Sequence, residues 1–305
     1  MSRPKLGLAL GSGAARGWAH IGVLNALEKM GLHPDIVTGT SIGALVGAAF
    51  VTGKLGALQT RMEVFGRRDT AMMLDLRLMT GGLIEGKRTD EFLDGLGIAG
   101  EIESFACRYG AVATELASGR EVWLQSGAVG RAVRASIGVP GVFSPTKFGE
   151  YGWLVDGGLV NPVPVSLARA LGADVVIAVD LNAELLGRRF VAQPSNPILP
   201  EPTEEVPQWL KKAITPIIAR VFEAGPDYPS YFEVLANTLN IMQDRITRAR
   251  LGGDPPDVLL RPRFGDFNWL DFHRATDAIR EGAACVEESK STLLRACHLW
   301  GDNAT

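Results

Sequence analysis

Histidine and cysteine are scarce in this chain, and each shortage narrows the chemistry that the protein can perform. The 305 residues include 4 histidines and 3 cysteines. A mechanism that needs an imidazole therefore has few candidates. Cys107, Cys285 and Cys297 lack the paired spacing of a metal site, and an odd number argues against a secreted disulfide framework. We therefore expect a reducing, cytoplasmic location.

The chain also lacks a surplus of basic residues and a long apolar run. Its 31 Lys and Arg residues against 34 Asp and Glu residues give a net charge of -3, so we expect no nucleic-acid partner. The apolar stretch 6–10 runs into glycines and does not form a signal-peptide core. The uncharged stretch 36–53 is interrupted by threonines and glycines, so we interpret it as a strand, a turn and a buried helix.

What the chain does contain is a regular alternation of strand-like and helix-like patterns. With 46% hydrophobic and 21% charged residues, it can bury a full core. The alternation predicts an α/β fold of three layers, α/β/α, with a mainly parallel sheet. The predicted strands are 5–10, 35–40, 108–114, 121–124, 153–155, 173–180 and 258–260, and the predicted helices are 18–30, 42–51, 130–137, 165–171, 208–223, 230–250 and 269–295.

The character of the chain changes after residue 185. Five prolines fall within 192–208, which indicates a linker or surface loop. We therefore divide the chain into an α/β domain at 1–185, a Pro-rich linker or loop at 186–208, and a helical C-terminal extension at 209–305 that packs on the core.

A G-x-S-x-G motif stands where the second predicted strand meets the helix that follows. The motif runs from Gly39 to Gly43 with Ser41 at its centre. Chance matches to so short a pattern are common, but a strand–turn–helix context is the one that exposes a nucleophilic serine. A sharp turn strains the serine, and flanking glycines remove side chains that would clash. A simple Gly-Ser turn that caps the helix stays an equal alternative at this point.

A glycine-rich loop, Gly11 to Gly17, joins the first predicted strand to the first helix. Its successive N–H groups suit either a phosphate or the oxyanion of acyl transfer. The dinucleotide fingerprint fails at Arg16, where a small residue is needed, and the Walker pattern lacks its Gly-Lys-Ser/Thr end. Both failures favour the oxyanion, although a tight turn without a ligand stays open.

A nucleophilic serine needs a base, and no histidine is well placed to supply one. The histidines are His20, His33, His273 and His298. They fall in helices or in a surface-like turn, and none follows a strand in a turn motif. Asp156 instead ends an apolar strand and precedes Gly157 and Gly158, which let another backbone or a substrate approach. A carboxylate that is partly desolvated there can act as a base, whereas an Asp-Gly-Gly taken alone is more simply a turn.

The order of the three motifs resembles that of the patatin-like phospholipase family. The resemblance is strongest to the bacterial branch similar to the catalytic core of neuropathy target esterase, and it covers about residues 5–180. The flanking segments 134–141 and 160–164 resemble the family too, as does the tail around 253–256 and 271–273. The family's fold is the patatin-like α/β/α sandwich.

The resemblance implies a serine acyl hydrolase that cleaves a lipid ester, a phospholipid or lysophospholipid, without metal or cofactor. It makes Ser41 the nucleophile and Asp156 the base of a dyad that dispenses with histidine. Plant members carry three glycines where this chain has Ser12, Gly13 and Ala14, so Ala14 narrows the oxyanion hole if its backbone requires glycine. The implied oxyanion-hole residues are Gly11, Ser12, Gly13 and Ala14, and the supporting residues are Arg16, Gly17, Gly39, Gly43, Gly157 and Gly158.

Two alternatives to the hydrolase remain: a phosphate- or nucleotide-binding protein that uses the glycine loop, and a non-catalytic lipid-binding or regulatory protein on the same scaffold. Two apolar segments are hypothetical contacts with lipid. The Met-rich segment 72–79 suits a lid or acyl-chain channel, and the stripe within 209–222 suits peripheral membrane contact. Ordinary packing within the domain is the favoured alternative for both. The oligomeric state is not predicted.

Overall fold

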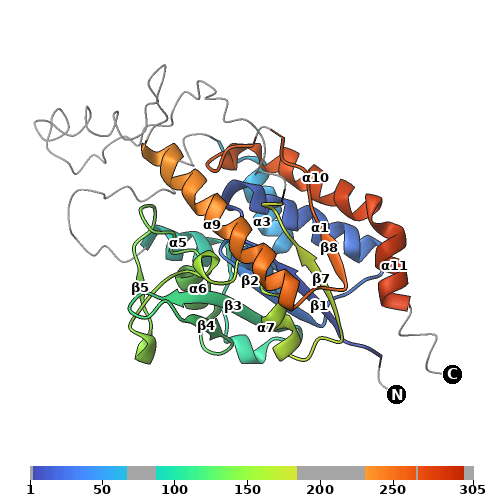
Figure 1. The fold of residues 1–305 in the computed structure, drawn as a ribbon, viewed down its shortest axis with the longest axis horizontal. Coiled ribbons are helices and arrows are strands. Elements are labelled where there is room, and N and C mark those ends of the chain that lie inside the picture. Colours follow the sequence, from blue (N-terminus) through green and yellow to red (C-terminus); the bar gives the residue numbers. More distant parts are fainter. Residues whose placement is uncertain (1–2, 67–86, 184–230, 266, 299–305) are drawn as a thin grey trace, which may run out of the picture.

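The computed structural model describes residues 3–66, 87–183, 231–265 and 267–298 (Figure 1), and these contain an eight-stranded mixed sheet. Its strand order is β5-β6-β3-β2-β1-β7-β8, with β4 paired to β3. The pairs β1–β2, β1–β7, β2–β3 and β7–β8 are parallel, and the rest are antiparallel. The strands are β1 Leu6–Leu10, β2 Ile36–Thr40, β3 Arg108–Glu115, β4 Glu121–Leu124, β5 Thr146–Lys147, β6 Trp153–Asp156, β7 Val175–Val179 and β8 Val258–Leu260.

Helices cover both faces of this sheet, which confirms the three-layer α/β/α fold. Leu8 and Leu10 of β1 face a large core with α1 and α2, whereas Ala9 faces a smaller core with α7. This alternation is expected for a strand buried on both sides. The helices are α1 Ala19–Lys29, α2 Ile42–Val51, α3 Leu55–Glu63, α5 Lys87–Leu96, α6 Val129–Ser136, α7 Val165–Ala170, α9 Tyr231–Gly253, α10 Ala275–Glu288 and α11 Lys290–His298.

The C-terminal part of the chain packs closely on the first 180 residues. Strand β8 extends the sheet beside β7, and α10 lies along α1. A Cβ atom added at Gly22 of α1 would lie 1.9 Å from the Ile279 carbonyl oxygen, and one added at Gly282 would lie 2.0 Å from the Ala19 carbonyl oxygen. The two helix backbones therefore touch through reciprocal glycines.

Most predicted elements are present within a few residues of their expected ends, with one clear error. The single helix predicted over 269–295 is a short 3-10 turn, Phe272–Arg274, followed by α10 and α11. The helix divides at Ser289 because α10 follows α1 while α11 turns to contact β8. Helices α3 and α5 were not predicted.

Three sequence predictions concern residues outside the described part of the chain: the Pro-rich segment 192–208, the Met-rich segment 72–79 and the stripe within 209–222. The division of the chain at 185 and 209 stays a prediction. No helix among the described residues has both the length and the apolar character needed to cross a membrane.

Candidate active site

Strands β2 and β6 meet end to end on one edge of β3, and this topology brings Ser41 to Asp156. The last residue of β2, Thr40, pairs with Val112, and the last residue of β6, Asp156, pairs with the next residue of β3, Ala113. Strand β4 pairs with both of these β3 residues and so occupies the opposite edge. Because β2 and β6 run toward each other, Ser41 follows β2 directly into contact with Asp156.

The turn at Ser41 has the strained geometry of a nucleophile elbow. Ser41 has φ 57° and ψ -123° and precedes the first turn of α2, a conformation that is uncommon for a residue with a side chain. A Cβ atom at Gly39 would lie 2.4 Å from the Gly43 carbonyl oxygen, and one at Gly43 would lie 2.2 Å from the Leu10 carbonyl oxygen. The turn therefore closes only with glycine at both positions.

The hydroxyl of Ser41 donates a hydrogen bond to the carboxylate of Asp156. The distance from Ser41 Oγ to Asp156 Oδ2 is 2.5 Å, and the N–H of Gly158 donates to Oδ1 over 2.7 Å. Asp156 is 2% exposed. Burial raises its pKa to about 6, against the opposite effect of the two hydrogen bonds. The carboxylate is thus ionised at neutral pH, and its raised pKa makes it a better proton acceptor than an ordinary aspartate.

Ser136, at the end of α6, fixes the backbone of the elbow. Its Oγ accepts a hydrogen bond from the Ser41 N–H over 2.9 Å and donates one to the Val112 carbonyl oxygen over 2.6 Å. A hydroxyl that both accepts and donates suits this buried position. The sequence places Ser136 in a segment that resembles the family, but no local pattern indicates this contact.

The glycine loop presents two N–H groups that make no hydrogen bond within the described residues, those of Gly13 and Ala14. The other two N–H groups that the sequence suggests are occupied. Gly11 donates to the Val179 carbonyl oxygen over 3.1 Å, and Ser12 donates to the Pro162 carbonyl oxygen over 2.8 Å. The four candidate donors to the oxyanion are therefore reduced to two, the N–H groups of Gly13 and Ala14. Ala14 adopts a φ of 48°. It therefore has the left-handed conformation that favours glycine, although it is an alanine.

The carbonyl groups of the same loop accept hydrogen bonds from side chains and so point into the protein. The oxygen of Gly11 accepts from His20 Nε2 over 2.8 Å, that of Ser12 from Asn182 Nδ2 over 3.4 Å, and that of Gly13 from Arg16 Nε over 3.1 Å. In a trans peptide unit the C=O and the N–H point in opposite directions. The N–H groups of Gly13 and Ala14 therefore point away from Asn182 and Arg16.

His20 and Arg16 are buried supports of this loop. A carbonyl oxygen only accepts, so His20 Nε2 carries the proton. Burial lowers the His20 pKa to about 4, which leaves the ring neutral. Burial also lowers the Arg16 pKa to about 10, against the charge of Asp180, so Arg16 stays protonated. Its side chain is 1% exposed and bonds to the protein itself, which weighs against a phosphate ligand at this loop.

The remaining glycines of the motifs provide close contacts around the dyad. A Cβ atom at Gly17 would lie 2.2 Å from the Ile42 side chain, and one at Gly157 would lie 2.2 Å from the Val112 carbonyl oxygen. A Cβ atom at Gly43 would also lie 2.8 Å from the Gly11 carbonyl oxygen. The structure therefore packs the loop against the elbow, and it packs the base turn against β3.

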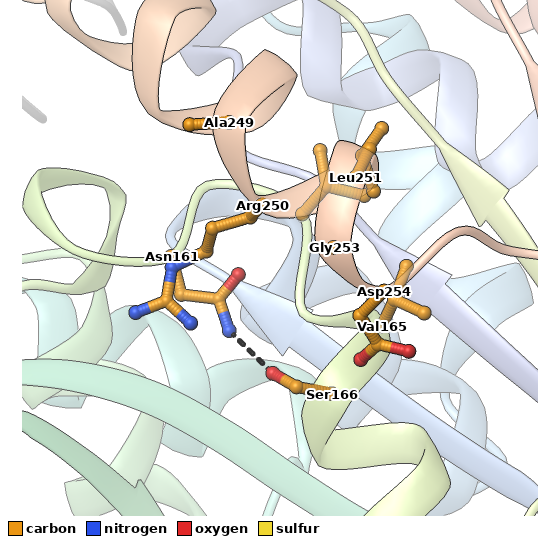
Figure 2. Close-up of a pocket in the computed structure, with 9 residues that line it drawn as sticks. Asn161, Val165, Ser166, Ala249, Arg250, Leu251, Gly253 and Asp254 are labelled. Atoms are coloured by element: carbon orange, nitrogen blue, oxygen red, sulfur yellow. Dashed lines mark hydrogen bonds between the residues drawn. The ribbon is translucent and has the colours of Figure 1, made fainter.

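A cavity of about 240 Å³ lies elsewhere, between the start of α7 and the end of α9 (Figure 2), and Ser41 and Asp156 do not line it. Two of its polar side chains bond to neighbouring side chains. Asn161 Nδ2 donates to Ser166 Oγ over 3.0 Å, and Arg250 Nη2 donates to Glu121 over 2.6 Å. We assign this cavity no part in the chemistry of Ser41.

Comparison with known proteins agrees with the motifs. Residues 8–169 match the family model described as patatin-like phospholipase. An uncharacterized NTE family protein of Mycobacterium tuberculosis is 31% identical over 94% of this chain and 92% of its own length. A second NTE family protein of that organism is 30% identical, with 95% and 48% covered. The lysophospholipase NTE1 of Coccidioides immitis is 30% identical over 91% of this chain but 17% of its own length.

Proposed function

The chain belongs to the patatin-like phospholipase family of lipid carboxylic ester hydrolases, and we propose that it cleaves its substrate through a Ser41–Asp156 dyad and an acyl-enzyme intermediate. The single observation that carries this proposal is the 2.5 Å hydrogen bond from Ser41 Oγ to Asp156 Oδ2. It joins a strained serine to a buried carboxylate, the pairing of nucleophile and base that covalent catalysis needs.

In the first half of the reaction, Ser41 Oγ attacks the ester carbonyl carbon as its proton passes to Asp156. A bond from Oγ to the acyl carbon forms, and the carbonyl oxygen becomes a tetrahedral oxyanion. When the intermediate collapses, the bond from the acyl carbon to the alcohol oxygen breaks. The proton held by Asp156 passes to that oxygen, and the alcohol leaves.

In the second half, water takes the place of the alcohol. Asp156 accepts a proton from water as the water oxygen attacks the acyl carbon. The bond to Ser41 Oγ then breaks, the proton returns to Oγ, and the fatty acid leaves. Each cycle therefore consumes one water molecule and restores both side chains.

The N–H groups of Gly13 and Ala14 are the proposed donors to the oxyanion. Two observations support them: they make no hydrogen bond within the described residues, and the partners of the Ser12 and Gly13 carbonyl groups direct them away from the protein side. Donors that are fixed before the reaction stabilise developing charge without reorganising, and one such donor is worth about 10²–10³-fold in kcat.

A fluorophosphonate probe tests the dyad directly. We expect the wild-type protein to be labelled covalently at Ser41 and to hydrolyse a lysophospholipid, the substrate class named for the NTE1 relative. We expect Ser41→Ala to lose both labelling and hydrolysis, with an unchanged circular dichroism spectrum. A folded wild-type protein that neither reacts with the probe nor cleaves any lipid ester would favour a non-catalytic lipid-binding protein on this scaffold.

The pH dependence of kcat/KM tests the base. Asp156 must be ionised to accept the serine proton, and its pKa is raised to about 6 by burial. We therefore expect kcat/KM to be constant above about pH 7 and to fall by about tenfold per unit well below pH 6. A soluble short-chain ester with no group that titrates in this range is the suitable substrate. A profile that stays flat down to pH 4.5 would remove Asp156 from this role.

A further inference from the structure

The amide of Gln243, on α9, is bonded to the loop that carries the proposed oxyanion hole. Gln243 is 6% exposed. Its Oε1 accepts hydrogen bonds from Ser12 Oγ over 2.9 Å and from Asn182 Nδ2 over 3.1 Å. Asn182 Nδ2 also lies 3.4 Å from the Ser12 carbonyl oxygen. Gln243 is therefore connected, through the side chains of Ser12 and Asn182, to the peptide unit that carries the Gly13 N–H.

The same amide lies against the turn that carries the proposed base. A Cβ atom added at Gly158 would lie 2.4 Å from Gln243 Nε2 and 2.9 Å from Asp156 Oδ1. Gly158 is also the residue whose N–H bonds to Asp156. Figure 1 shows α9, in orange, running diagonally across the molecule, and α9 contacts the turn at Gly157–Leu159. One side chain thus touches both halves of the site.

One turn earlier on α9, Asn240 is connected in a similar way to the peptide unit that carries the Ala14 N–H. Asn240 Oδ1 accepts a hydrogen bond from Arg16 Nη2 over 3.0 Å, while Arg16 Nε donates to the Gly13 carbonyl oxygen over 3.1 Å. The peptide unit that ends in the Ala14 N–H is therefore connected to α9 as well. Residues at i and i+3 share one helix face, so a single face of α9 supports both units.

We infer that Gln243 is a positioning residue for the reaction, assisted by Asn240, and that α9 belongs to the catalytic unit. This rests on the proposed function. Helix α9 lies outside residues 8–169, which the family model matches. The loop also needs external support, because Ala14 sits in a conformation unfavourable for alanine. Without Gln243 the Ser12 hydroxyl and the Asn182 amide lose an acceptor. The backbone hydrogen bonds of Gly11 and Ser12 remain, so we expect the Gly13 N–H to be less well fixed while the loop stays in place.

Gln243→Met tests the inference with little change in side-chain length. We expect kcat for a soluble short-chain ester to fall by about tenfold to a hundredfold, because a displacement of about 1 Å at a reacting group can cost that much. We expect KM to change by less than about threefold, since the loop donors act on the transition state. The matched control is Met242→Gln at the adjacent, 45% exposed position, which should keep wild-type kcat and KM.

Ser12→Ala provides a second, less disruptive route to the same contact. It removes the hydroxyl that donates to Gln243 and should lower kcat, as Gln243→Met does. If both residues act through one network, the double variant should lose less kcat than the product of the two single losses. A simple loss of stability would instead lower the amount of folded enzyme without changing kcat per labelled Ser41.

The outcomes separate the inference from the proposed function. If the wild-type protein has no hydrolysis that depends on Ser41, the proposed function fails. If it has such hydrolysis and folded Gln243→Met keeps kcat within threefold of wild type, the positioning role is wrong. If Gln243→Met fails to fold, Ser12→Ala and Asn240→Ala provide the same test. A kcat equal to that of the wild-type protein in both variants would overturn the positioning role.

Discussion

Asp156→Asn is expected to abolish turnover and, at neutral pH, to make the folded protein more stable. An amide cannot accept the serine proton, so we expect kcat to fall by at least about 10³-fold. The fold should survive, because an asparagine oxygen can accept the Gly158 N–H while its NH₂ group donates to Ser41 Oγ. The same substitution removes a carboxylate that is 2% exposed, and burying that charge costs free energy.

The stability gain should depend on pH in a defined direction. The Asp156 pKa is 3.8 in the reference state and about 6 when folded, so between these values the folded wild-type protein binds more protons than the unfolded chain. Wild-type stability therefore falls as pH rises through this window. The asparagine variant does not titrate there, and its advantage should grow from near zero below pH 4 to as much as about 3 kcal/mol above pH 6.

Denaturant unfolding of both proteins at pH 4 and pH 8 measures this difference. The fluorophosphonate probe is the companion measurement, because it reports on Ser41 in the same samples. A variant less stable than wild type at pH 8 would mean that the ionised carboxylate contributes more through its hydrogen bonds than it loses on burial. A variant that keeps wild-type kcat would mean that another group takes the proton. Stability and activity are thus expected to move in opposite directions.

The fold was predictable because its strands and helices have local patterns. The strands 6–10 and 175–179 are short apolar runs buried on both faces, and turns that contain glycine follow strands β1, β2 and β6. Helix α3 escaped prediction because its mean character is polar and only Leu55, Leu58 and Met62 are buried. The break between α10 and α11 was missed because it depends on two different packing partners, which a local pattern does not contain.

The site was only partly predictable for the same reason. Ser41 and Asp156 lie 115 residues apart, and they meet because β2 and β6 share one edge of β3. Each residue carries a local signal, a glycine on either side of the serine and two glycines after the aspartate. Gln243 and Asn182 carry none, because a buried amide in a helix or loop looks like any other polar residue until its partners are known. Sequence motifs therefore identify the reacting groups, and the tertiary fold identifies what holds them.

Gly43→Ala should be a severely damaging single-methyl change in the site, although alanine is the better helix former. Gly43 is the second residue of α2, and its missing Cβ would lie 2.2 Å from the Leu10 carbonyl oxygen and 2.8 Å from that of Gly11. Both neighbours are backbone atoms, one at the end of β1 and one at the start of the glycine loop, so neither can rotate away. We expect a loss of stability of about 3 kcal/mol, the upper end of the usual cost of overpacking.

The same change should also reduce activity in whatever protein remains folded. Relief of the clash must separate the elbow from the loop, which moves Ser41 relative to the N–H groups of Gly13 and Ala14. We expect fluorophosphonate labelling to slow by at least about tenfold per folded molecule. Thermal denaturation gives the folded fraction, and the labelling rate is measured well below the transition.

Gly56→Ala in α3 is the matched control for this experiment. A Cβ atom at Gly56 would meet nothing within 4 Å, so the alanine adds helix propensity without a clash and should stabilise the protein by about 0.5–1 kcal/mol. Opposite signs for the same chemical change would show that contact with the loop, rather than helix propensity, decides the residue at position 43. If the free energy of unfolding of Gly43→Ala lies within 1 kcal/mol of the wild-type value, the elbow and the loop are not in rigid contact. The oxyanion hole must then form by movement during the reaction.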